Sequence, residues 1–259
     1  MKANMQLMGT VATVALIGGT NAMAQVATPA PAAPKWETIA NAGLIVQSGN
    51  SESIATSIGL DTKKKWDSDE VLLGASGGYG KSSSTGNNRS RTTDYAKAYG
   101  QYNHLISERA YFGLRIDGEH DGMADLAYRV RVSPLVGYYL IKNETTSLSF
   151  DAGPTFIVEE REASPTTARD RRESFALRFG EKFEHKLSDT TKIWQTAEYI
   201  PTIKDWPEYD VINFEAGLST AITPKWDLTV KYQVTYDNGV KFGKEGTDTR
   251  LIAGTTYKF

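Results

Sequence analysis

The stretch that decides the fold covers residues 228–236, Leu-Thr-Val-Lys-Tyr-Gln-Val-Thr-Tyr. Apolar or aromatic residues occupy every second position, and polar residues occupy the positions between them. Successive side chains of a β-strand point to opposite faces, so this stretch predicts a strand with one apolar and one polar face. Similar alternation recurs over residues 110–117, 128–138 and 212–222. No window after Lys35 shows a convincing helical stripe, so we expect an all-β protein.

About twelve such segments follow one another along the chain, each of roughly the length that a membrane-crossing strand needs. The strands are expected over residues 36–48, 52–66, 70–81, 91–104, 109–120, 126–140, 146–159, 173–187, 191–201, 209–222, 226–237 and 248–259. Tight connections are expected at 65–69, 105–108, 141–145, 188–190 and 223–225, and longer ones at 82–90, 119–126, 160–172, 202–208 and 237–247.

The connections therefore alternate between short and long, except that residues 49–51 form a short one where a long one was due. Short periplasmic turns and longer external loops are typical of barrels in the bacterial outer membrane. We predict a transmembrane antiparallel up-and-down β-barrel with both termini in the periplasm. A secreted soluble β-sandwich would also alternate, because one face of each sheet packs on a core, but it would not predict this rhythm of connections.

The composition agrees with a barrel and excludes several other classes. The 259 residues include no cysteine, which excludes a disulfide framework and a thiolate zinc site. The formal net charge of -2 provides no broad basic field for nucleic acid, so we expect no nucleic-acid partner. The mean hydropathy of -0.40 excludes a bundle of membrane helices, whereas alternating barrel strands average out as polar.

The amino terminus has the pattern of an export signal. Lys2 provides a positive start, residues 7–18 are uncharged and apolar or small, and Ala22-Met23-Ala24 matches the small-x-small cleavage pattern. The apolar run is shorter than the ~20 residues of a membrane-spanning helix. We predict a cleaved signal peptide over residues 1–24, an Ala/Pro-rich periplasmic linker over 25–35, and a barrel over 36–259 in the outer membrane.

Aromatic residues gather at the predicted strand ends, where indole and phenol rings favour the interface between lipid and water. Most lie beside the short turns, and Tyr236 lies toward the external side. The predicted aromatic girdle comprises Trp36, Trp66, Trp194, Trp226, Tyr102, Tyr111, Tyr138, Tyr236 and Tyr257. Two residues break the alternation: Trp194 falls on the polar face of its strand and Glu181 on the apolar face. A bulge or a strand end would explain either.

The last strand ends in an aromatic residue after regular alternation. Its outward set is Leu251, Ala253, Thr255, Tyr257 and Phe259. This pattern resembles the carboxy-terminal signature that outer-membrane proteins present to the barrel assembly machinery, which we expect to be a partner.

The order and spacing of several short motifs resemble the YdiY-like family, whose members are labelled salt-induced outer membrane proteins. The motifs are Ser48-Gly49-Asn50-Ser51, Tyr128-Arg129-Val130-Arg131 running to Gly137-Tyr138-Tyr139-Leu140, Asp151-Ala152-Gly153-Pro154, Tyr236-Asp237-Asn238, Asp248-Thr249 and Tyr257-Lys258-Phe259. The resemblance covers nearly all of the mature chain. It implies an outer-membrane barrel with a link to salt or osmotic stress, and it provides no catalytic residue.

If the apolar faces contact lipid, their polar partners face the lumen. The predicted lumen-lining residues are Arg115, Asp117, Glu119, Arg129, Arg131, Asp151, Arg178, Lys182, Glu184, Glu198, Glu215, Lys231 and Arg250. Two interpretations remain open for this balanced set. The charges can pair and fill the barrel, giving a structural protein, or they can line a narrow passive channel for ions or small polar solutes.

Signals for an enzyme are weak. His104 and His185 lie near predicted short turns, and His120 stands between Glu119 and Asp121 near a long loop. A hydrolase could use a histidine oriented by a carboxylate, but no nucleophile motif accompanies it. We expect no enzyme, no cofactor and no metal site. The arginines of the external loop 160–172 could pair with lipopolysaccharide phosphates, although a solvated charged loop is the simpler interpretation.

The predicted faces can be tested on the strand that opened this section. Val230→Arg should destabilise the barrel by ~2–4 kcal/mol near the bilayer midplane, because it places a charge against lipid. Thr229→Arg adds the same charge on the inward face and should be better tolerated. The measurement is the folded fraction on a heat-modifiability gel. Equal tolerance at both positions would count against the alternation.

Overall fold

The computed structural model describes residues 35–48, 53–83, 89–163, 169–204, 209–239 and 246–259. The predicted signal peptide and residues 25–34 of the predicted linker lie outside the described residues. Within the described part of the chain, no helix is long and apolar enough to cross a membrane.

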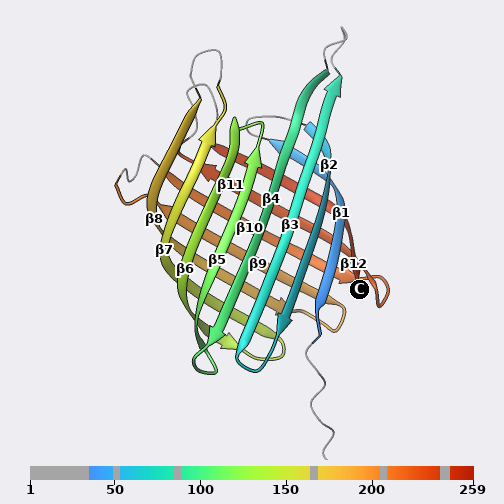
Figure 1. Cartoon of the computed structure of the whole chain (residues 1–259). Coiled ribbons are helices and arrows are strands. Elements are labelled where there is room, and N and C mark those ends of the chain that lie inside the picture. Colours follow the sequence, from blue (N-terminus) through green and yellow to red (C-terminus); the bar gives the residue numbers. More distant parts are fainter. Residues whose placement is uncertain (1–34, 49–52, 84–88, 164–168, 205–208, 240–245) are drawn as a thin grey trace, which may run out of the picture. The chain divides into compact units, whose positions relative to one another are not determined.

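The described residues form twelve strands, each antiparallel to its sequence neighbours. β1 also pairs with β12, so the sheet closes on itself (Figure 1). The strands are β1 Glu37–Ser48, β2 Ser53–Lys65, β3 Asp69–Ser83, β4 Arg89–Leu105, β5 Ala110–Asp121, β6 Leu126–Lys142, β7 Thr146–Arg161, β8 Asp170–Lys186, β9 Thr191–Pro201, β10 Asp210–Ala221, β11 Trp226–Asp237 and β12 Thr247–Lys258. The predicted all-β closed barrel of about twelve strands is confirmed.

Four of the five short turns have the same hydrogen bond between a side chain and the backbone. Ser107, Asn143, Ser188 and Thr223 each accept, through the side-chain oxygen, a hydrogen bond from a backbone N–H three residues later. Such turns replace the ladder hydrogen bonds that the backbone loses as it reverses. These residues set one end of the barrel, which we call the short-turn end. The opposite end, where the longer connections begin, is the long-loop end (Figure 1).

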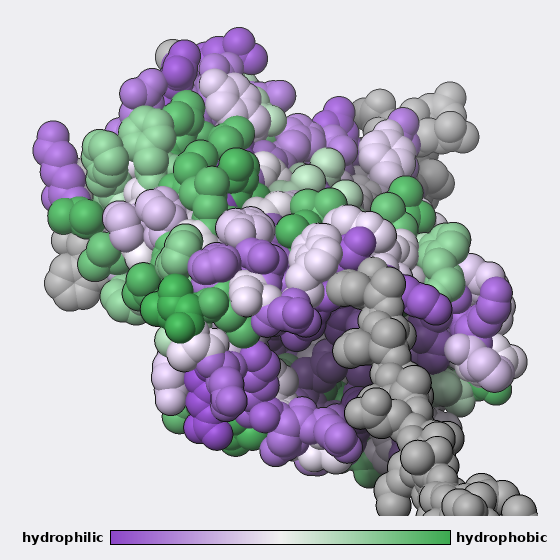
Figure 2. Space-filling model, turned by 60° about the horizontal axis from the view of Figure 1, so that its bottom comes forward, coloured by the Kyte–Doolittle hydropathy of each residue, from purple (hydrophilic) through white to green (hydrophobic). Residues whose placement is uncertain are grey.

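The two faces of the sheet differ sharply in polarity. Large apolar side chains stand exposed on the outer face, for example Ile54 at 72% and Val136 at 67%. Buried charged residues such as Arg129 and Arg178 lie on the inner face, exposed by only 4% and 6%. Figure 2 shows the short-turn end, where hydrophilic residues surround a recess and hydrophobic residues gather on the outer wall. A soluble protein has charged residues outside and apolar residues inside. The opposite distribution, with apolar residues outside and charged residues inside, is the pattern that a lipid-facing barrel requires.

Apolar side chains do reach the interior in three clusters. Ile45, Ala55, Tyr95 and Ile252 form the first, Ile157, Ala176, Ile200 and Val211 the second, and Tyr111, Leu135 and Tyr139 the third. Ile45 and Ala176 are fully buried. The interior of the barrel is therefore a packed core in places, not a uniform pore.

Barrel closure depends on a close approach between the first and last strands. Gly43 of β1 pairs with Gly254 of β12. A β-carbon on Gly254 would lie 2.1 Å from the backbone oxygen of Ala42 and 2.5 Å from the α-carbon of Gly43. Only glycine fits at this point, because the obstructing atoms belong to the backbone and cannot rotate away.

Gly254→Ala should therefore lower the free energy of unfolding by about 1–3 kcal/mol, the range for overpacking a well-packed site. Gly118 of β5 provides a matched control, since a β-carbon there meets no atom within 4 Å. Gly118→Ala should change stability by no more than about 0.5 kcal/mol. Denaturant midpoints of the refolded variants measure both effects. An equal loss in the two variants would refute the steric explanation of the seam.

Candidate functional site

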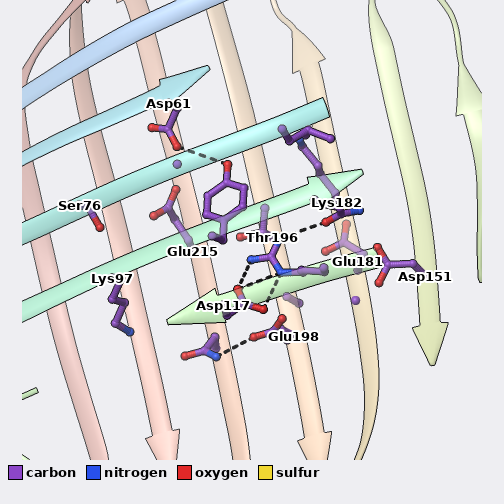
Figure 3. Close-up of a pocket in the computed structure, with 18 of the residues that line it drawn as sticks. Asp61, Ser76, Lys97, Asp117, Asp151, Glu181, Lys182, Thr196, Glu198 and Glu215 are labelled. Atoms are coloured by element: carbon purple, nitrogen blue, oxygen red, sulfur yellow. Dashed lines mark hydrogen bonds and ion pairs between the residues drawn. The ribbon is translucent and has the colours of Figure 1, made fainter. Parts of the chain in front are cut away.

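The barrel interior holds a cavity of about 420 Å³ lined mainly by polar and charged residues. Figure 3 shows side chains such as Asp61, Asp117, Lys182 and Glu215 directed from different strands into the same space. Of the predicted lumen-lining residues, all except Arg129 line this cavity. The strand alternation places them there, because each occupies the inward parity of its strand.

Two arginines in the middle of the cavity bind carboxylates of their own or neighbouring strands. Arg178 lies between two carboxylates: its Nε donates to Glu198 at 2.7 Å and its Nη1 to Asp151. Arg115 holds Asp117 in a fork, with Nη2 and Nε at 2.7 and 3.0 Å from the same oxygen. Both arginines are largely buried, and such bidentate or doubly paired geometry fixes the side chains in place.

A second group of charges, which we call the Arg129 cluster, fills the interior near the long-loop end. It consists of Arg129, Arg161, Glu119, Glu159 and Asp237. Arg129 donates to Glu159 at 2.6 Å, to Asp237 at 2.7 Å and to Glu119 at 2.9 Å. Arg161 donates to the same oxygen of Asp237 at 2.9 Å. Both arginine side chains are only 4% exposed, so the cluster packs like a core.

The Arg129 cluster joins three consecutive strands, β5, β6 and β7, to β11, which is distant in sequence. Arg250 of β12 pairs with Asp121 of β5 at 2.8 Å and stacks its guanidinium over Tyr95. The pairs that Arg129 and Arg250 form with carboxylates link neighbouring strands or cross the lumen, so these charges connect the barrel wall from within. Buried pairs of this kind are costly to break by removing one partner.

The prediction that Arg161 lies in an external loop was wrong. The sequence analysis assigned residue 161 to an external loop, but β7 continues to Arg161 and directs its side chain into the lumen, where it is 3% exposed. The alternation of Asp151, Ile157 and Glu159 already predicts this orientation. The loop boundary was set too early because charged residues cluster at that strand end.

The predicted aromatic girdle is partly outside and partly inside the barrel. The rings of Trp36 and Trp66 meet edge to face at 6.4 Å, and those of Trp226 and Tyr257 at 5.0 Å. Tyr102 and Tyr138 stand exposed at 45% and 48%. Tyr236 is half-buried and pairs with the outward Ile212.

Trp194 and Tyr111 contradict the girdle assignment. Trp194 packs over Gly217, where a β-carbon would come within 2.2 Å of its ring, and donates to the lumen carboxylate Glu215 at 2.9 Å. Tyr111 is 3% exposed and donates to Asp151. A glycine on the neighbouring strand leaves room for each ring inside the barrel: Gly217 lies against Trp194, and Gly137 lies against Tyr111. The position of Trp194 on the polar face of its strand therefore predicted its inward orientation correctly.

Sequence reasoning missed several inward residues. Tyr99 donates to Asp61 at 3.4 Å, and Tyr139 donates to Glu70 at 2.7 Å. Tyrosines had been sought only at the lipid interface, although a phenol can also pack inside while its hydroxyl binds a carboxylate. Asp237 escaped notice because it is the last residue of β11, at the border of a predicted loop.

The histidines do not assemble into a catalytic group with the predicted neighbour. Asp121 pairs with Arg250, while His120 Nδ1 lies 2.9 Å from the backbone oxygen of Ala127 and Nε2 lies 3.8 Å from Asp94. His104 contacts Asp69 at 2.9 Å. Among the described residues there is no group of three or more histidine and acidic residues that could hold a metal ion.

The carboxy-terminal strand presents its predicted signature on the outer face. Leu251, Ala253, Thr255 and Phe259 are exposed, and Tyr257 is half-buried against Trp226 and Phe259. The intervening residues Ile252 and Thr256 are buried on the inner face.

Solved structures resemble this fold at low sequence identity. The NanC porin matches with a TM-score of 0.57 and 10% identity over 85% of this chain and 100% of that chain. The KdgM porin in complex with disordered oligogalacturonate gives 0.47 and 12% over 86% and 99%. The translocator domain of the autotransporter NalP from Neisseria meningitidis gives 0.49 and 11% over 86% and 88%. The NanC match shows that the chain has the fold of an outer-membrane porin.

A comparison with curated protein sequences finds no match. A comparison with protein families matches residues 40–259, which is nearly the whole described barrel. The resemblance to the YdiY-like family is thereby confirmed, and the chain belongs to the family described as "Protein of unknown function, DUF481".

Proposed function

We propose that this protein is a narrow passive channel of the bacterial outer membrane for ions or small polar solutes. The observation that carries the proposal is the cavity of about 420 Å³ lined by charged side chains inside a closed barrel. Charged rings and polar walls lower the barrier for ions to enter a pore. A barrel without a pathway could fill the same space with apolar residues, as it does in its three interior clusters.

The placement in a membrane follows from the outer face. The exposed apolar side chains form the belt that contacts lipid, and aromatic residues such as Trp36, Trp66 and Trp226 mark its edge at the short turns. We assign the short turns and both termini to the periplasm, as in other barrels with this rhythm of connections. Export by the signal peptide, recognition of β12 by the assembly machinery and contacts with lipopolysaccharide complete the proposal.

The Arg129 cluster would form the constriction of the channel. It adjoins the cavity through Glu119 on the side of the long-loop end, and its side chains are buried and mutually paired. Small ions could pass only where such pairs exchange partners or leave a gap, which makes the conductance low. A second candidate function rests on the same observation: if the cluster never opens, the protein is a structural barrel that stabilises the envelope.

Planar-bilayer recording of the refolded mature protein separates these two functions. A channel should give steady unitary conductance in potassium chloride once a heat-modifiability gel shows the folded barrel. The structural barrel should be folded and electrically silent. A folded but silent protein at every voltage would refute the channel.

The position of the constriction can be tested by removing a whole ion pair. Arg129→Ala with Asp237→Ala removes one cation and one anion, so the net charge of the cluster is unchanged. Arg161 and Glu159 remain 3.6 Å apart, and Glu119 keeps Lys97 at 3.6 Å and Arg131 at 3.7 Å. Unitary conductance should rise several-fold, because the packed layer loses the guanidinium of Arg129 and the carboxylate of Asp237. Arg171→Ala with Glu173→Ala is the matched control, since that pair spans 3.0 Å but is exposed by 60% and 56%. Equal conductance in the two double variants would place the constriction elsewhere.

A further inference from the structure

The carboxylates that line the cavity are all engaged by donors. Asp117 is held by Arg115, Asp151 and Glu198 by Arg178, and Glu119 by Arg129. The others are likewise bonded to lysine, tyrosine, tryptophan or amide groups. A permeating cation would have to compete with these internal donors for every acidic group that it meets.

Lys182 of β8 differs from these carboxylates because it has no bonded partner among the described residues. It lines the cavity, yet among the described residues it forms no hydrogen bond and no ion pair. Its cross-strand neighbours are Ser149 and Thr196, two short neutral side chains that leave its ammonium open to the lumen. The residue is exposed although it points inward, because the cavity around it is wide enough for water.

Charges of both signs lie near Lys182. Lys63 and Lys65 are like charges that act on it, and Glu184, Glu70 and Asp61 are opposite ones. All three carboxylates have other partners: Glu184 pairs with Lys192 at 3.6 Å, Glu70 pairs with Lys65 at 3.2 Å, and Asp61 accepts hydrogen bonds from Asn41 and Tyr99. An open ammonium in a polar cavity is therefore left to attract mobile anions from solution.

A second under-used cation lies deeper in the cavity. Arg131 is 5% exposed, and its Nε and Nη1 atoms have no hydrogen-bond partner within the part of the chain that the structure describes. Its closest carboxylate oxygen, on Glu119, is 3.7 Å away and already receives a hydrogen bond from Arg129 at 2.9 Å. Lys182 and Arg131 thus both retain hydrogen-bond donors that a mobile anion can use.

We infer that the pathway selects small anions, and that Lys182 is the residue that determines this selectivity. The inference rests on the proposed channel function and names the class of solute that it carries: small anions, whether chloride or small carboxylates and phosphates, which share a negative charge. A lysine in a pore attracts the anion without holding it rigidly, because its ammonium is mobile and strongly hydrated.

The test is the reversal potential of refolded mature protein in a gradient of potassium chloride across a planar bilayer. The wild-type protein should favour chloride over potassium. Lys182→Gln should reduce this preference several-fold, Lys182→Glu should reverse it, and Lys182→Arg should preserve it. Potassium acetate and potassium phosphate gradients then distinguish which small anions pass.

Lys225 offers a matched control at the same end of the barrel. It is exposed in the β10–β11 turn and contacts Tyr257, and it does not line the cavity. Lys225→Glu makes the same charge change and should leave the selectivity unchanged. A conducting channel that favours potassium, or one whose selectivity is the same in wild type and Lys182→Glu, would overturn the inference. Absence of all conductance in the folded protein would instead refute the channel function itself.

Discussion

Backbone N–H and C=O groups that meet hydrocarbon must be paired, and a closed ring of antiparallel strands is one of the two ways to achieve this. The pairing of β1 with β12 completes the ring and removes the sheet edges. Once the ring is closed, each strand has one face toward lipid and one toward the interior. The exposed apolar belt and the buried charges are two consequences of the same closure.

The charges in the interior then determine what the barrel can do. An isolated charge inside a narrow barrel is costly to desolvate, so nearly every one is matched by a partner. At the long-loop end the matching is tight, as Arg129 alone binds three carboxylates. Nearer the short-turn end, Lys182 lines the cavity and has no such partner among the described residues. In the channel that we propose, the packed layer and the cavity around Lys182 lie in series and give a narrow pathway with a preferred sign of ion.

Strand positions could be predicted from the sequence because the period of two persists through each membrane-crossing segment. The inward parity of Arg178 or Lys231 followed directly from their strands. Arg161 and Asp237 were not assigned to the lumen, because both are the last residues of their strands and the loop boundaries were set too early. Trp194 and Tyr111 were wrongly assigned to the aromatic girdle, because their aromatic character was given more weight than their positions in the alternation of their strands. Each ring packs in the space that a glycine leaves on the neighbouring strand, Gly217 for Trp194 and Gly137 for Tyr111. These pairings depend on the register between two strands, which cannot be predicted from the sequence of one strand alone.

The partners of individual charges could not be predicted either. Asp121 and Arg250 are 129 residues apart, and Arg129 and Asp237 are 108 residues apart. Such pairs depend on the curvature of the ring and on bulges such as the register shift between Glu119 and Asp121. The sequence therefore predicts which residues face the lumen but not which of them remains unpaired.

A single-cysteine labelling experiment tests the central claim of a hydrated, charged lumen inside an apolar belt. The chain has no cysteine, so one thiol can be placed at will. Lys182→Cys faces the cavity, and Phe179→Cys lies on the outer face of the same strand, where the phenylalanine is 46% exposed. In liposomes, a charged membrane-impermeant thiol reagent should modify position 182 rapidly and leave position 179 unmodified. Rapid modification at 179 with protection at 182 would contradict the account.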